Sequence, residues 1–125
     1  MSFQQGLSGL AAAATALDVI GNNVANASTV GFKSANANFS DVFAASLGVG
    51  GASQVGIGVA VSAIQQQFSQ GNLTTTNNGM DLAINGGGFF RMSDDGAISY
   101  TRNGQFHLDK EGYVVNDQQL RLTGY

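Results

Sequence analysis

The chain of 125 residues contains no cysteine and no proline. Without cysteine it can form neither a disulfide framework nor a thiolate metal site. No apolar run reaches the roughly 18 residues needed to span a bilayer. The N-terminal stretch has no early Lys or Arg, and its apolar residues are spaced rather than continuous, so it does not resemble a cleaved secretory signal. If the protein leaves the cytoplasm, we expect a route that needs no such signal.

Charge is scarce and unevenly distributed. Eight Asp and Glu residues stand against five Lys and Arg, which argues against nucleic acid or an anionic membrane as partner because both attract clustered cations. Residues 1–64 hold only Asp18, Lys33 and Asp41. A soluble domain surface is usually about a quarter charged or more. The first half of the chain is therefore either disordered or covered by neighbouring molecules, and its apolar pattern favours cover.

The first 26 residues have the pattern of a long helix with one apolar stripe. Apolar and small residues recur at alternating spacings of four and three, as at the a and d positions of a heptad repeat. The alanine run at 11–14 favours helix, and Asn22, Asn23 and Asn26 favour an end near residue 26, because Asn side chains compete with helical backbone bonding. The stripe residues expected to contact other subunits are Phe3, Leu7, Leu10, Ala14, Leu17, Ile20 and Val24.

The remaining polar positions of this helix carry no Lys or Glu, which an ordinary surface helix would show. We place Gln4, Gln5, Ser8, Thr15 and Asn22 on its outer face. Since isolated helices are marginal in water, the segment is expected to be largely disordered in a free monomer and helical only when packed. The pattern alone leaves open an ordinary amphipathic helix folded onto its own domain.

Residues 27–53 predict an extended connector rich in Ala, Ser, Asn and Gly. Apolar residues recur at helix-like intervals over 39–47, so a short helix or turn is possible there. Gly48, Gly50 and Gly51 then form a flexible break, and we take them as hinge candidates.

The rest of the chain predicts a small, mainly antiparallel β domain. From Val55 apolar and small residues alternate, which predicts a half-buried strand, and a phase slip at Ala63 predicts a bulge. Short strands follow, separated by turns such as Asp94-Asp95-Gly96, and Asn103-Gly104 favours a tight hairpin. The fold class is therefore α+β. The predicted parts are a coiled-coil-type helix (1–26), the connector (27–53) and the β domain (54–125).

No constellation of residues points to catalysis, a cofactor or a metal. Gly86-Gly87-Gly88 lacks the Lys-Ser/Thr of a phosphate loop. The chain has one histidine, His107, and a single His makes neither a usual zinc site nor a hydrolytic triad. We therefore expect no enzyme activity and no cofactor. A ligand-binding β module with a helical tether is the alternative from a different class.

Two blocks of the sequence resemble the bacterial flagellar rod and hook proteins. The first is Leu-Asp-Val-Ile-Gly-Asn-Asn-Val-Ala-Asn at 17–26, followed by Thr29 and Gly-Phe-Lys at 31–33. The second runs from residue 71 to residue 106. The matching signature positions are Asn22, Asn23, Asn26, Thr29, Gly31, Phe32, Lys33, Asp81, Gly88, Phe89, Phe90, Arg102, Gly104 and Phe106. The opening Met-Ser-Phe, the short connector and the final Leu-Thr-Gly-Tyr are most similar to hook proteins, with rod proteins as the close competitor.

The resemblance implies a structural subunit of a helical tube. For a hook this is a curved universal joint that transmits motor torque to the filament, and for a rod it is a drive shaft. The N-terminal helix would lie in an inner tube with a C-terminal helix of the same chain, which is absent here, so we expect this chain to be an N-terminal portion. The implied partners are further copies, that C-terminal helix, the distal rod protein, the hook cap, the hook–filament junction proteins and the type III export apparatus. The implied location is the flagellar hook outside the cell, with no nucleic acid and no small-molecule substrate.

Overall fold

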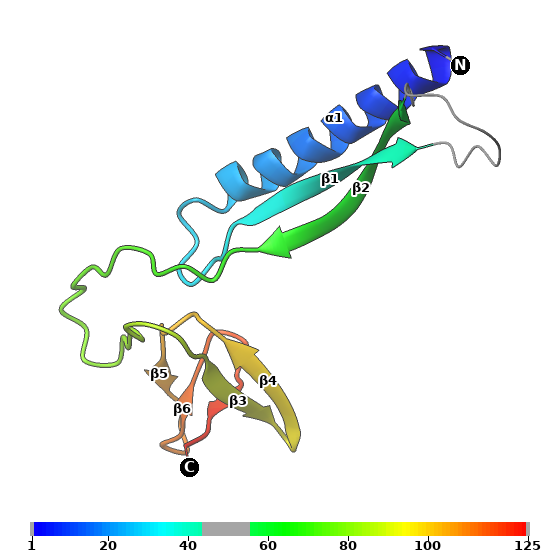
Figure 1. Ribbon diagram of the computed structural model, residues 1–125. Coiled ribbons are helices and arrows are strands. Elements are labelled where there is room, and N and C mark those ends of the chain that lie inside the picture. Colours follow the sequence, from blue (N-terminus) through cyan, green and yellow to red (C-terminus); the bar gives the residue numbers. More distant parts are fainter. Residues whose placement is uncertain (1, 44–55, 125) are drawn as a thin grey trace. The chain divides into compact units, whose positions relative to one another are not determined.

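The computed structural model describes residues 2–43 and 56–124, which form two compact units. The first unit contains the residues up to Asn26 and those from Ser34 to Gln67, and the second contains Ala27–Lys33 and the residues from Phe68 onward. The chain therefore leaves the first unit after Asn26, returns to it at Ser34 and leaves it again at Phe68, a path that can be followed by colour in Figure 1.

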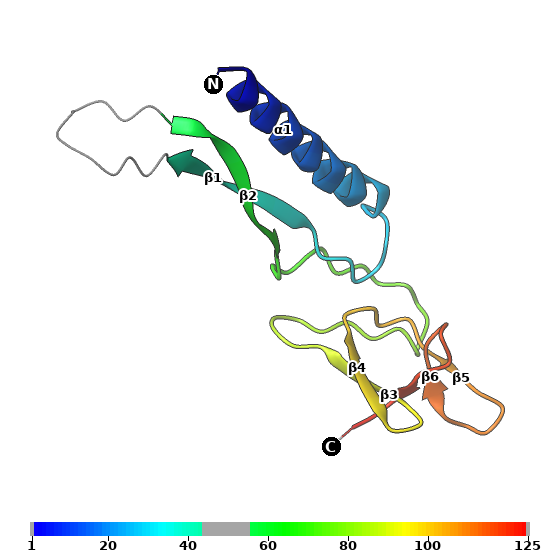
Figure 2. The same cartoon turned by 90° about the vertical axis from the view of Figure 1, so that its right-hand side faces the viewer.

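The first unit consists of one helix and one β-hairpin. Helix α1 (Ser2–Ala25) runs beside strands β1 (Ala35–Phe43) and β2 (Gly56–Gln66), which pair antiparallel (Figures 1 and 2). The predicted helix is confirmed within one residue of its expected end. The predicted bulge is also found, because the pairing passes from Ala63 to Val61 and leaves out Ser62.

Strand β1 lies inside the predicted connector, so the structure differs from the prediction there. Residues 39–43 continue a strand, where the sequence pattern had left a short helix or turn possible. Its Ala, Asn and Ser residues have low strand propensity, and the cause is long-range: the Val- and Ile-rich β2 supplies a partner. Strand β2 accordingly belongs with the helix and not with the later strands. The hinge candidates Gly48, Gly50 and Gly51 lie outside the described residues.

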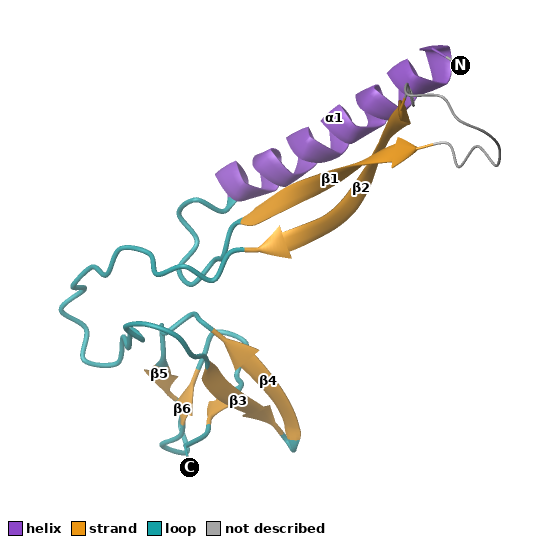
Figure 3. Ribbon diagram, in the orientation of Figure 1, coloured by secondary structure: helices purple, strands orange, loops and turns teal. Residues whose placement is uncertain are grey.

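The second unit is built on a five-stranded antiparallel sheet with the order β4-β3-β7-β6-β5. Figure 3 shows the strands of this unit in orange, joined by loops in teal. Its strands are β3 (Phe90–Asp94), β4 (Ala97–Thr101), β5 (His107–Leu108), β6 (Val114–Val115) and β7 (Arg121–Leu122). The predicted turn at Asp94-Asp95-Gly96 joins β3 to β4, with positive φ at Asp95 and Gly96. The prediction of a hairpin at Asn103-Gly104 is wrong, because β4 and β5 lie at opposite edges of the sheet.

Fully buried side chains are few and belong to the second unit. Met92, Phe106 and Val115 form its core, and the ring of Phe90 packs edge-on against Phe106 with centroids 5.2 Å apart. No described residue of the first unit is buried. Among the residues that the structure describes, no helix is both long and apolar enough to cross a lipid bilayer.

Candidate subunit interface

The apolar stripe predicted on α1 is open along its whole length. The exposed fractions of its large side chains range from 55% for Ile20 to 83% for Phe3, and Ala14 is exposed as well. The other open stripe residues are Leu7, Leu10, Leu17 and Val24. Large exposed apolar surfaces mark interaction sites on soluble proteins. The stripe is therefore the candidate interface, and the hairpin of the same chain leaves it uncovered.

The helix meets its own hairpin through a different face, made of small and polar residues. Side chains on this face are half-buried, and they recur at spacings of three and four just as the stripe does. They are Gln5, Ser8, Ala12, Thr15, Ala16, Val19 and Asn23. Placing Gln5, Ser8 and Thr15 on the outer face was therefore wrong, whereas Gln4 and Asn22 are exposed as expected. A second repeat of small residues in the sequence was the signal that could have revealed this face.

Hydrogen bonds join the N-terminal half of α1 to β2. The Gln5 side-chain amide donates to the carbonyl of Gly56 (2.8 Å), and the N–H of Val59 donates to Ser8 Oγ (3.3 Å). Gly58 lies between these contacts with φ +139°, and a Cβ there would come within 2.4 Å of Ser8 Oγ. Only glycine permits so close an approach of helix and strand. Polar contacts thus fix which way the stripe faces.

The C-terminal end of α1 carries the asparagines of the signature. Asn26 donates to the carbonyl and to the side-chain oxygen of Asn22, both at 3.0 Å, across the last helical turn. Asn23 exchanges two hydrogen bonds with the backbone of Ala35, where β1 begins. These residues end the helix and attach the hairpin to it.

The Gly-Phe-Lys run of the signature anchors residues 27–33 within the second unit. Gly31 has φ +77°, and a Cβ there would lie 2.5 Å from the backbone nitrogen of Asn103. The N–H of Phe32 donates to the carbonyl of Thr29 (3.2 Å), and Lys33 Nζ donates to the carbonyl of Ser69 (2.7 Å). The segment can therefore take this course only with glycine at position 31.

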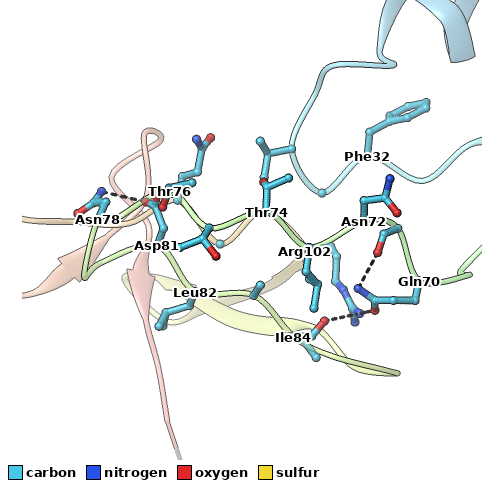
Figure 4. A pocket seen from close by; sticks show the side chains of 18 of the residues that line it. Phe32, Gln70, Asn72, Thr74, Thr76, Asn78, Asp81, Leu82, Ile84 and Arg102 are labelled. Atoms are coloured by element: carbon cyan, nitrogen blue, oxygen red, sulfur yellow. Dashed lines mark hydrogen bonds between the residues drawn. The ribbon is translucent and has the colours of Figure 1, made fainter.

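Arg102 organises the glycine-rich loop before β3. Its guanidinium donates to Gln70 Oε1 (3.0 Å) and to the carbonyl of Ile84 (3.1 Å), and Figure 4 shows Arg102 beside these two residues. It also donates to the carbonyls of Gly86 and Gly88. All of these acceptors are neutral. Arg102 thus holds several backbone carbonyls of the loop at once, which it can do because its planar guanidinium carries five N–H donors.

The other signature residues also hold the second unit together. Leu82 N–H donates to the carbonyl of Gly104 (2.8 Å), and a Cβ on Gly104 would overlap the Leu82 carbonyl. Asp81 accepts a hydrogen bond from the Asn78 amide (3.0 Å). Phe89 packs edge-on against Phe68 with centroids 5.7 Å apart. These signature residues therefore make contacts that hold the loops and strands of the second unit in place.

An open pocket of about 510 Å³ lies within the second unit. Its walls are the Gly-Phe-Lys segment, the extended residues 70–79, and the stretch from Asp81 to Ile84, with Arg102 at its side (Figure 4). Threonines and asparagines from residues 72–78 contribute to this lining together with apolar side chains such as Leu73, Leu82 and Ile84. Among the residues that the structure describes, no three His, Asp or Glu side chains gather as a metal site.

The open apolar stripe lies on a unit in which none of the described residues is buried, and such a surface is typical of proteins that contact other protein molecules. Residues 3–33 match the family of flagella basal body rod proteins, and residues 83–124 match the D1 domain family of the flagellar hook proteins FlgE/F/G. The chain therefore belongs to the rod and hook family of flagellar structural proteins.

Individual relatives agree with this assignment. Over 126 aligned residues the chain is 53% identical to the flagellar hook protein FlgE of Salmonella typhimurium and to that of Escherichia coli, with all of this chain covered. It is 37% identical over 124 residues to the basal-body rod protein FlgG of Bacillus subtilis, covering 91% of this chain and 47% of that protein. The chain spans about 30% of the length of the hook relatives.

Proposed function

We propose that this chain is part of a structural subunit of the bacterial flagellar hook, a self-assembling curved tube that acts as a universal joint and transmits motor torque to the filament. The observation that carries the proposal is the open apolar stripe of α1. Its strongest outside support is the 53% identity to hook proteins along the whole chain. No enzymatic step is part of this role.

The stripe would be covered by the same helix in neighbouring copies and by a C-terminal helix from outside this chain. Two facts favour several covering helices over one. The large side chains from Phe3 to Val24 span the full helix, and the helix has a single charged residue, Asp18. Since none of the described residues of the first unit is buried, assembly would supply most of its core and much of its order.

The further partners are those of a hook: the distal rod protein, the hook cap and the hook–filament junction proteins. The export route is the flagellar type III apparatus, without a cleaved signal peptide, to a site outside the cell. Support for these comes from the family alone. Co-assembly of the complete protein with each of these partners would test the partners. Loss of its secretion in a strain that lacks the export gate would test the export route.

Removal of residues 2–25 from the complete protein tests the role of the helix. We expect the variant to stay soluble with a folded second unit, because Met92, Phe106 and Val115 keep their contacts, but to form no tubes in electron micrographs. A scrambled helix of equal composition is the control. Normal tubes from the deletion variant would refute the proposal.

We further propose that Gly48, Gly50 and Gly51 form a hinge that lets subunits shift as the tube bends. Supporting this, residues 1–64 offer few ion pairs that could resist such a shift. Replacing the three glycines with alanine should straighten or stiffen the tube. Unchanged curvature and unchanged swimming would contradict the hinge.

A rod subunit is the second candidate, favoured by the 37% identity to the Bacillus subtilis rod protein FlgG. A rod is stiff and straight where a hook is curved. Tubes grown from the purified complete protein separate the two: curved tubes support the hook, and straight shafts support the rod.

The third candidate, a ligand-binding β module with a helical tether, is favoured by the open pocket of the second unit. Thermal unfolding with common nucleotides, sugars and Ca²⁺ tests it. A saturable shift of several degrees, lost on replacing a wall residue such as Thr74, would support binding.

A further inference from the structure

The backbone of Ala35 has an unusual partner at the start of β1. Its carbonyl accepts a hydrogen bond from Asn23 Nδ2 at 2.7 Å, and its N–H donates to Asn23 Oδ1 at 2.9 Å. One side-chain amide thus satisfies both backbone groups of one residue. Ala35 lies opposite Gln66 on β2, while the next bond of the ladder runs from Gln67 N–H to the carbonyl of Ser34 (2.8 Å).

This pattern shows which way Ala35 faces. In an antiparallel pair, residues alternate between exchanging both backbone hydrogen bonds with the opposite residue and pointing both groups away from it. Since both groups of Ala35 bond to Asn23, they point to the outer edge of β1. The Asn23 amide therefore occupies the place that the peptide group of a third strand would take.

Helix side chains also bond to the backbone at the opposite edge of the hairpin. The outward N–H of Val59 and the carbonyl of Gly56 on β2 bond to Ser8 and Gln5. A two-stranded ribbon has two open edges, and unpaired edges invite pairing with other chains. Side chains near both ends of α1 thus engage one edge each, so the helix is fixed to the ribbon in one register.

We propose that Asn23 is a positioning residue for assembly. By replacing a third strand at Ala35, it fixes β1 against the end of α1 and thereby sets which helix face is left for contacts between subunits. Of the three helix side chains that bond to the hairpin edges, Asn23 has the strongest hold, because it makes two hydrogen bonds to one backbone residue. Gln5 and Ser8 each make one hydrogen bond to the edge of β2. The inference rests on the proposed assembly of the chain into a tube.

The test uses a chemical property of the amide. In Asn23→Asp at neutral pH, a carboxylate oxygen faces the carbonyl of Ala35 and repels it. A protonated carboxyl has the shape of the amide, with an O–H that donates to the carbonyl and an oxygen that accepts the N–H. Aspartate carboxyls take up a proton near pH 4 in water. Acid should therefore restore the contact.

Asn22→Asp is the matched control, because it puts the same charge in the same helical turn at an exposed position that does not bond to Ala35. The measurement is the critical concentration for tube formation by the complete protein between pH 7 and pH 3.5, with the wild type measured at each pH. We expect N23D at pH 7 to need on the order of tenfold more protein than N22D, as the loss of one to two hydrogen bonds predicts. The difference should vanish as the pH falls toward 4. Asn23→Ala, which cannot regain the bonds, should stay impaired throughout.

Equal critical concentrations for N23D and N22D at pH 7 would overturn the inference, and so would a difference that does not change with pH. If the wild type forms no tubes, the proposed function fails, and helix content by circular dichroism then decides the inference separately. A pH-dependent gap in helix content between N23D and N22D would uphold the contact, and the absence of a gap would refute it.

Discussion

Truncation of Leu10 to alanine separates the stability of the single chain from the stability of the polymer. Leu10 has 69% of its surface exposed, so the single chain gains little from it. Alanine is also the best helix former, so helix formation should not weaken. We therefore expect Leu10→Ala to leave the helix content of the unassembled protein unchanged or slightly raised.

The effect on the polymer should be large by comparison. Full burial of a leucine side chain contributes roughly 1.5–3 kcal/mol. With 69% of its surface still available, Leu10 can contribute roughly 1–2 kcal/mol to contacts between subunits. At about 1.4 kcal/mol per factor of ten, its removal should raise the critical concentration roughly five- to thirtyfold.

The assay is sedimentation of tubes over a series of protein concentrations, with Gln4→Ala as the control at an exposed position outside the stripe. A cavity left at the contact would push the Leu10→Ala value toward the upper end of the range. Identical critical concentrations for the two variants would show that the stripe is not the contact surface, and the argument from exposure would then fail.

Three further substitutions test the second unit. Gly31→Ala should lower the free energy of unfolding by at least about 1–2 kcal/mol, because its φ is +77° and its Cβ would meet the Asn103 backbone, whereas Gly71→Ala has open space and should change little in the same urea titration. Equal midpoints would contradict the close contact at Gly31. Arg102→Lys keeps the positive charge but loses the guanidinium donors that bond to several carbonyls of the loop, so hydrogen exchange of the Gly86 amide should accelerate. Unchanged exchange would show that the guanidinium does not order this loop. Met92→Ala removes a side chain with no exposed surface and should cost about 2–5 kcal/mol in thermal or urea unfolding, with a smaller loss contradicting its place in the core.

Local patterns predicted the elements that depend on near neighbours in the chain. The heptad spacing from Phe3 to Val24 placed both the helix and its open stripe, because each turn of a helix repeats its own geometry. The turn at Asp94-Asp95-Gly96 was predictable for a similar reason, since positive φ suits these residue types and the turn joins adjacent strands.

Features that depend on distant residues were missed. Strand β1 has weak strand propensity and exists through β2, from which 12 undescribed residues (44–55) separate it. Asn103-Gly104 has the composition of a hairpin turn. Position 104 nevertheless requires glycine for another reason, because the Leu82 carbonyl lies where a side chain would be. The repeat of small and polar residues on α1 indicates a second contact face, but it does not reveal what that face contacts, because the backbone groups that bond to Gln5, Ser8 and Asn23 belong to the distant strands β1 and β2.

The order of the two units along the chain has a consequence for folding. The chain crosses from one unit to the other after Asn26, after Lys33 and after Gln67. Each unit is therefore built from two separate stretches of sequence. During synthesis, α1 emerges before the hairpin that it packs against, and residues 27–33 emerge before Ser69 and Asn103, which they contact. Folding of the two units is thus interleaved along the sequence, and neither unit can be completed before the chain has passed through part of the other.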